Sequence, residues 1–195
     1  AVNFALSVVY QQAGNIGGGG FMLYRLANGE RGALDFRERA PLKASRDMYL
    51  DDAGEVIKGL SLKGHYAVGV PGSVAGMAAL HARFGSQPWD ALVRPSIHLA
   101  QNGFDLTPKA AHMFNRYQQD FRDVNRFSPA VIKPEGDWAA GERIRFPDLA
   151  RTLDRIAMQG RAGFYQGETA KLIAEEMMAG GGLVSLQDLA AYKAV

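Results

Sequence analysis

Four consecutive glycines, Gly17 to Gly20, run directly into the apolar segment FMLYRL at 21–26. Glycine lacks a Cβ and tolerates positive φ, so this run favours close approach of another backbone or a ligand, although tight packing alone is the simpler interpretation. A phosphate-binding loop is excluded, because it needs a lysine and a hydroxyl residue where Phe21 and Met22 stand. A dinucleotide-binding fingerprint fails too, since it needs a glycine at Met22 and a following helix.

Two strand-length apolar runs follow the glycines, FMLYRL at 21–26 and ERGALDF at 30–36. Asn28-Gly29, which lies between them, is a strong signal for a β-hairpin. The pattern therefore predicts an antiparallel hairpin that places Asp35 and Arg37 at the end of its second strand.

The remainder of the chain is predicted to be mostly helical. Residues 1–11 have the apolar character of the end of a buried helix, and proline in the first turn predicts helices that begin at Thr107-Pro108 and Phe146-Pro147. Ser73 is expected to cap a helix that ends at Gly85, and Gly160 is expected to end the helix that begins at Pro147. Another helix is expected at 168–178, and the spacing of Ser185 and Asp188 fits a capping box at the start of a last helix. The order of helix, hairpin and helices indicates an α+β fold without repeated βαβ units.

The composition excludes several classes of protein. Apolar residues make up 47% and charged residues 22%, as in ordinary globular domains. Lys and Arg number 22 against 20 Asp and Glu, with no basic stripe, so a nucleic-acid partner is not expected. No run of about 18 apolar residues predicts a membrane span, and the absence of cysteine removes thiol chemistry and disulfides. We expect one domain or part of one, because the sequence has no internal repeat, low-complexity tract or linker. Both ends look cut, so a fragment is the simpler interpretation.

Histidine spacing does not support a metal site. No pair among His65, His81, His98 and His112 has the i, i+4 spacing with an adjacent glutamate that a helical zinc site uses. We therefore expect no bound metal.

Nucleophile and carboxylate motifs are equally weak. Ser73 has Pro71 and Ala75 where a nucleophile elbow requires glycines, so a helix cap is the simpler role. Asp51-Asp52 and Glu175-Glu176 are neighbours whose side chains point in different directions, which favours solvated surface for both pairs.

The segment DFRERAP at 35–41 is the strongest candidate for a binding site. Its charges follow the end of a predicted strand, where scaffolds present binding groups. Arg37 could bind a carboxylate through two parallel hydrogen bonds, which lysine cannot do. Chemistry alone favours the alternative, an ordinary ion pair of Arg37 with Asp35 or Glu38.

Blocks of sequence along the whole chain resemble the large subunit of the γ-glutamyltranspeptidase family, in the family's order. The specific blocks are QAGNIGGGGFML at 12–23, DFRERAP at 35–41, SRDMYLDDAG at 45–54 and VPGSVAGM at 70–77. Looser blocks are RPSIHLAQNGF at 94–104, LARTLDRIAMQGRAGFYQG at 149–167 and SLQDLAAYKAV at 185–195. The resemblance implies that residues 1–195 are a single incomplete domain, a portion of that large subunit.

The resemblance also implies a fold and an activity. Members are N-terminal-nucleophile hydrolases with an αββα sandwich, made as a zymogen that cuts itself before a threonine. That threonine begins the small subunit and carries γ-glutamyl groups from glutathione and other γ-glutamyl compounds to water, amino acids or peptides. This chain would contribute no catalytic residue and would be inactive alone. Its partners would be the small-subunit portion and the γ-glutamyl substrate, and no cofactor would be needed. The protein would act in the periplasm or outside the cell.

One residue of this chain takes a family role directly. The arginine of the family's D-F-R-E block, which holds the α-carboxylate of the glutamyl group, falls on Arg37, and this match reverses the preference for a plain ion pair. Two alternatives stay open. One is an amidohydrolase of the same fold that resembles a glutaryl-cephalosporin acylase, and the other is a catalytically inactive scaffold homologue.

Overall fold

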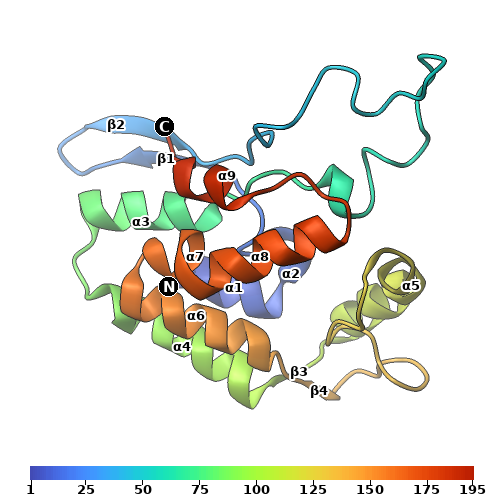
Figure 1. Ribbon diagram of the computed structural model, residues 1–195. Coiled ribbons are helices and arrows are strands. Elements are labelled where there is room, and N and C mark those ends of the chain that lie inside the picture. The colour runs from blue at the N-terminus through green and yellow to red at the C-terminus, as the bar shows by residue number, and fades with distance from the viewer.

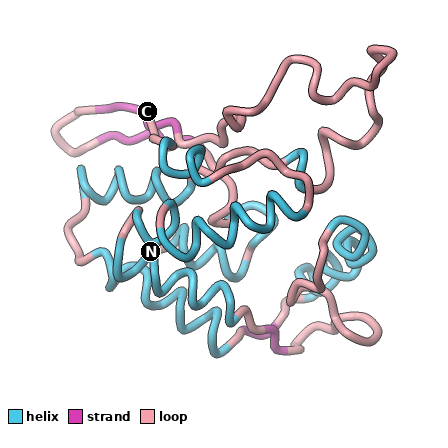
Figure 2. Tube along the Cα trace, viewed as in Figure 1, coloured by secondary structure: helices cyan, strands magenta, loops and turns pink.

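The computed structural model describes all residues from 1 to 195 and shows a mostly helical body with a hairpin on one side (Figures 1 and 2). The helices are α1 (Val2–Val9), α2 (Gln11–Gly14), the 3-10 helix η1 (His65–Ala67), α3 (Ser73–Phe84), α4 (Trp89–Asn102), α5 (Pro108–Val124), α6 (Pro147–Gln159), α7 (Ala162–Tyr165), α8 (Gly167–Ala179) and α9 (Leu186–Ala191). The strands are β1 (Phe21–Arg25), β2 (Arg31–Asp35), β3 (Phe104–Asp105) and β4 (Arg143–Ile144). None of these helices is both long enough and apolar enough to cross a bilayer.

The core lies among α1, α4, α6 and α7, which stack in the lower part of Figure 1. Val93 of α4 and Leu153 and Ile156 of α6 are fully buried between these helices. The Trp89 indole N–H donates to the Ile156 carbonyl at 2.7 Å and so locks α4 onto the end of α6. The helix expected at residues 1–11 is present as α1 but is interrupted at Tyr10, where α2 begins after it. It buries only one face, because Phe4 is 3% exposed and Val2 is 73% exposed.

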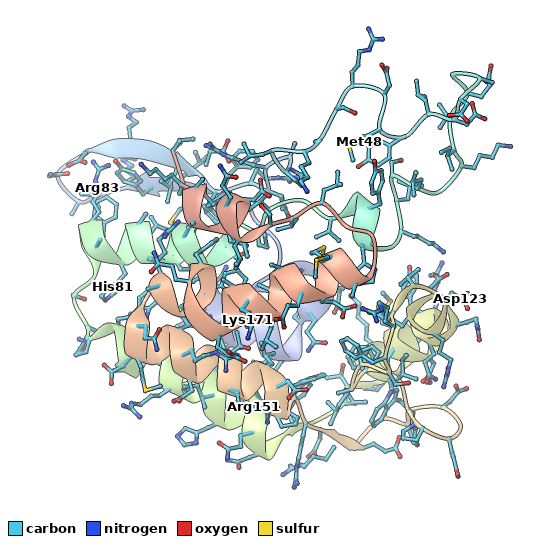
Figure 3. All side chains as sticks on the ribbon, viewed as in Figure 1. Met48, His81, Arg83, Asp123, Arg151 and Lys171 are labelled. Carbon is cyan, nitrogen blue, oxygen red and sulfur yellow. The ribbon has the colours of Figure 1, made fainter.

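The predicted hairpin is confirmed. β1 and β2 pair antiparallel with Phe21 opposite Asp35. The Gly29 amide donates to the Leu26 carbonyl, and Gly29 has φ +88°, so the glycine closes a turn that a side chain would strain. The hairpin lies beside α3, where Arg83 reaches it (Figure 3) and pairs with Glu30 at 2.7 Å.

Apart from the cap at Ser73, the helix boundaries predicted from proline, glycine and capping residues are confirmed. The Thr107 hydroxyl accepts from the Ala110 amide at the start of α5, and Gly160 ends α6 with φ +60°. Ser185 and Asp188 form the expected capping box of α9. The sequence patterns did not predict α4, which has no side-chain cap and contains Pro95, nor the two-residue pairing of β3 with β4.

Two polar predictions are wrong. Ser73 does not cap α3, since it is the first helical residue and its hydroxyl donates to the Asn15 carbonyl at 3.1 Å. Glu176 is not free surface, because its carboxylate lies 2.7 Å from His65 Nε2. Asp51, Asp52 and Glu175 are exposed, as predicted.

Glycines from two distant segments surround Phe36, the residue that follows β2. A Cβ on Gly19 would lie 2.8 Å from Arg37 Cα, and one on Gly72 or Gly76 would collide with the Phe36 carbonyl or ring. The predicted close approach of another backbone is thus confirmed at Gly19, but none of Gly17 to Gly20 has positive φ. Phe36 is 5% exposed and fixes the hairpin end against α3.

This packing predicts an unusual effect for Gly76→Ala in the complete protein. Alanine in place of glycine inside a helix ordinarily stabilises by about 0.5–1 kcal/mol. Here the methyl would overlap the Phe36 ring, so we expect a loss of about 1–3 kcal/mol in the free energy of unfolding, as in other overpacked cores. Thermal unfolding measures it.

The matched control is the same substitution in a Phe36→Ala background. Alanine removes the Cγ and Cδ1 atoms that the new methyl would overlap, so Gly76→Ala should cost less there than in the parent protein. A rise in Tm for Gly76→Ala alone would show that the glycines do not confine Phe36.

Candidate functional site

Arg37 stands at the rim of a cavity of about 610 Å³ between the end of β2 and the long loop before α3. The lining includes Arg37, Glu38 and Arg39 on one side and Tyr49, Tyr66 and Val68 on the other. Glu38 is the only carboxylate in this lining. We call this space the Arg37 cavity.

The backbone that carries Arg37 is held on both sides. Phe36 exchanges backbone hydrogen bonds with Gly20, which extends the β1–β2 pairing by one residue. Arg39 exchanges two more with Val70, at 3.1 and 2.8 Å. The Arg37 amide itself donates to Asp35 Oδ1 at 2.8 Å. A backbone fixed in this way restricts the directions in which the Arg37 side chain can point.

The Arg37 side chain is 60% exposed and only partly engaged. Its Nε lies 3.2 Å from Glu38 Oε2, and its guanidinium carbon lies 5.8 Å from the Phe21 ring centroid. The two terminal nitrogens make no hydrogen bond within the chain. An ion pair with Glu38 is therefore present, as the simpler interpretation expected. The edge of the guanidinium that carries the two terminal nitrogens stays free to bind a carboxylate through two hydrogen bonds.

The electrostatics of the cavity suit a small ionic ligand. Arg37 and Glu38 present opposite charges side by side, and Arg39 adds a second cation that lies over the Tyr192 ring at 5.7 Å. A second hollow of about 470 Å³ between α2 and α5 has no charged residue in its lining, which includes Met113, Phe114 and Phe121. That second hollow therefore has no charged group with which an ionised ligand could pair.

The other polar residues singled out from sequence do not gather near Arg37. His65 binds Glu176, and His81 Nε2 lies 2.7 Å from the Gln87 carbonyl oxygen. No group of three potential ligands comes together to hold a metal.

The sequence patterns missed Tyr192, which lies under the Arg37 segment. Its hydroxyl donates to the Arg37 carbonyl at 2.7 Å across 155 residues of sequence. Burial, first of all, raises the pKa of this phenol, with the neighbouring Arg39 acting in the opposite direction. A buried tyrosine at a helix end has no local signature, so only the fold reveals this contact.

Comparisons with known proteins place the whole chain in one family. A family model described as gamma-glutamyltranspeptidase matches residues 1–195. The glutathione hydrolase proenzyme of Pseudomonas sp. (strain A14) is 46% identical over 194 residues, which are 99% of this chain and 34% of that protein. The chain thus spans about a third of the length of the curated relatives it matches.

Solved structures share the fold. The Helicobacter pylori gamma-glutamyltranspeptidase matches with a TM-score of 0.96 and 43% identity, over 100% of this chain and 56% of that one. A cephalosporin acylase from Bacillus halodurans matches with a TM-score of 0.87 and 27% identity, over 99% of this chain and 37% of that one. The prediction of a mostly helical segment with a hairpin, belonging to the fold that these enzymes share, is therefore confirmed. Because the family model matches every residue, the chain belongs to the gamma-glutamyltranspeptidase family.

Proposed function

We propose that residues 1–195 are a portion of the large subunit of a glutathione hydrolase that also transfers γ-glutamyl groups, and that they supply the α-carboxylate site of the glutamyl donor. The observation that carries this proposal is Arg37, held on a fixed backbone at the cavity rim with both terminal nitrogens free. A guanidinium placed in this way matches the planar geometry of a carboxylate.

In this proposal the chemistry occurs on a threonine outside the chain. The threonine hydroxyl attacks the γ-carbonyl of the donor while its own α-amine takes the proton, and the cysteinylglycine portion of glutathione leaves as an amine. Water or the amine of an amino acid or peptide then attacks the γ-glutamyl ester and frees the threonine. Arg37 keeps the donor in register through both steps by holding a group that does not react.

The threonines of this chain are unsuited to that role. Thr107 caps α5, Thr152 donates to the Asp148 carbonyl, and Thr169 donates to the Gly163 carbonyl. Each lies inside the chain, so none has a free α-amine beside its hydroxyl. The nucleophile is therefore assigned to the small-subunit portion, which would be released by self-cleavage and remain the partner of this chain.

A glutaryl-cephalosporin acylase remains the main rival, because a glutaryl group also ends in a carboxylate that Arg37 could bind. Two observations favour the γ-glutamyl donor. Three bacterial relatives named glutathione hydrolase proenzyme are 43–47% identical, against 27% for the cephalosporin acylase. Glu38 also places a negative charge beside Arg37, where the α-ammonium of a glutamyl group would be attracted and a glutaryl group has no counterpart.

The resemblance to the family also suggests where the complete protein acts and what it needs. We propose a periplasmic or secreted enzyme that needs neither metal nor cofactor and has no nucleic-acid partner. The third possibility, an inactive scaffold, differs only in what the complete protein does in an assay.

Residues 1–195 alone are expected to release no p-nitroaniline from γ-glutamyl-p-nitroanilide above a buffer blank. The reason is that covalent transfer requires the absent threonine. The complete protein, assayed beside it, should be active, and circular dichroism should establish that the isolated chain is helical. Activity of the isolated chain would contradict the assignment, and an inactive complete protein that has cleaved itself would favour the scaffold.

Arg37→Lys in the complete protein should lower kcat/KM by roughly ten- to a hundredfold, because a charge-assisted hydrogen bond contributes about 1.5–3 kcal/mol. Lysine keeps the charge and loses the paired geometry. Folding and self-cleavage should survive, and the loss should appear mainly in KM, measured with γ-glutamyl-p-nitroanilide and beside the Tm.

Arg46→Lys is the matched control, since Arg46 is 91% exposed and pairs only with its neighbour Asp47. It should leave kcat/KM unchanged. If Arg37→Lys instead lowers Tm and leaves kcat/KM unaltered, Arg37 is a structural ion pair and does not bind the donor.

A further inference from the structure

The last eleven residues, 185–195, lie along the segment that carries Arg37. We call residues 185–195 the clamp segment and residues 35–42 the Arg37 segment. Val195 exchanges two backbone hydrogen bonds with Asp35, at 2.6 and 2.9 Å. At the other end, Asp188 Oδ1 accepts from the Leu42 amide at 2.7 Å. The contact of Tyr192 with the Arg37 carbonyl lies between these two.

Of the residues that make these contacts, Tyr192 is the most firmly held. It is 3% exposed, and its ring stacks on Tyr165 with centroids 5.8 Å apart and an interplanar angle of 11°. The Arg161 guanidinium donates to the Tyr192 carbonyl at 2.6 Å. Both the ring and the backbone of Tyr192 are therefore fixed to α7 and the turn before it, so its hydroxyl has a defined position.

The position of that hydroxyl matters because of the atom it contacts. The Arg37 carbonyl belongs to the peptide that joins Arg37 to Glu38, and rotation of this peptide would redirect both charged side chains. No other hydrogen bond within the chain reaches this carbonyl. Tyr192 is thus the one side chain that fixes the peptide between the two opposite charges of the cavity.

We propose that Tyr192 is a positioning residue, which fixes the Arg37–Glu38 peptide and thereby aims the Arg37 guanidinium at the donor carboxylate. This inference rests on the proposed function of Arg37. Tyr192 does not line the cavity and touches no ligand itself, so its effect must pass through Arg37 and Glu38.

The protonation states of Asp188 and Tyr192 suit the hydrogen bonds that they make with the Arg37 segment. Burial alone would raise the pKa of Asp188, but hydrogen bonds from Ser185 and from the Leu42 amide lower it below its usual value. Asp188 is therefore ionised and accepts charge-assisted bonds, which are stronger than neutral ones. Tyr192, whose pKa is raised, keeps the proton that it donates.

The test is Tyr192→Phe in the complete protein, alone and combined with Arg37→Lys. Phenylalanine keeps the stacked ring and removes only the hydroxyl. We expect kcat/KM for γ-glutamyl-p-nitroanilide to fall about three- to tenfold, the size of one neutral hydrogen bond, through KM with kcat nearly unchanged. In the Arg37→Lys background the same substitution should have little further effect, because the two residues act as one unit.

Tyr165→Phe is the matched control. Tyr165 is as buried as Tyr192, but its hydroxyl donates to the Pro71 carbonyl and accepts from the Ala75 amide, and it makes no hydrogen bond to the Arg37 segment. It should lower Tm and leave KM unchanged. If Tyr192→Phe does not fold, Asp188→Asn loosens the same segment at Leu42 and should raise KM in the same Arg37-dependent way.

The outcomes separate the two proposals. An unchanged KM in Tyr192→Phe overturns the positioning role even when Arg37→Lys lowers kcat/KM. A loss that is equally large with and without Arg37→Lys also overturns it, since Tyr192 would then act by another route. An Arg37→Lys variant with full kcat/KM overturns the proposed function of Arg37 itself.

Discussion

The packing of Phe36 against glycines is the constraint on which the rest of the structure depends. The ring and carbonyl of Phe36 occupy space that Gly19, Gly72 and Gly76 leave open. This contact joins the hairpin to the start of α3, although the two are far apart in sequence. Because Phe36 immediately precedes Arg37, the same contact sets where the cavity begins. The buried Phe36 thus fixes the backbone from which the exposed Arg37 side chain extends.

In the proposed function, the chain supplies recognition and the reaction occurs on a part of the protein outside residues 1–195. Arg37 and Glu38 would offer a cation and an anion to the end of the donor that does not react, while the nucleophile would belong elsewhere. Such a division requires the binding group to be stiff, because a shift of about 1 Å in the donor can cost a hundredfold in rate. The backbone bonds at Phe36 and Arg39 and the hydroxyl of Tyr192 meet that requirement.

Local signals made much of the fold predictable. Asn28-Gly29, Thr107-Pro108 and the pair Ser185 and Asp188 each act within a few residues, so the hairpin and the helix ends were found correctly. The helix α4 was missed because it has no capping side chain and contains Pro95, which normally interrupts a helix.

Long-range contacts could not be predicted in the same way. The bonds from Glu176 to His65 and from Tyr192 to Arg37 join residues more than 100 positions apart, and no pattern in the sequence encodes such a distance. Arg37 was singled out by its block of sequence, whereas its chemistry alone favoured an ion pair, and its binding role stays a prediction. Its support by the clamp segment became visible only in three dimensions.

The most direct test of the central claim is a crystal structure of the complete protein with glutamate bound. Both terminal nitrogens of Arg37 should lie about 2.7–2.9 Å from the two oxygens of the α-carboxylate, and the Tyr192 hydroxyl should still donate to the Arg37 carbonyl. A structure in which the α-carboxylate binds elsewhere, while Arg37 remains paired only with Glu38, would contradict it.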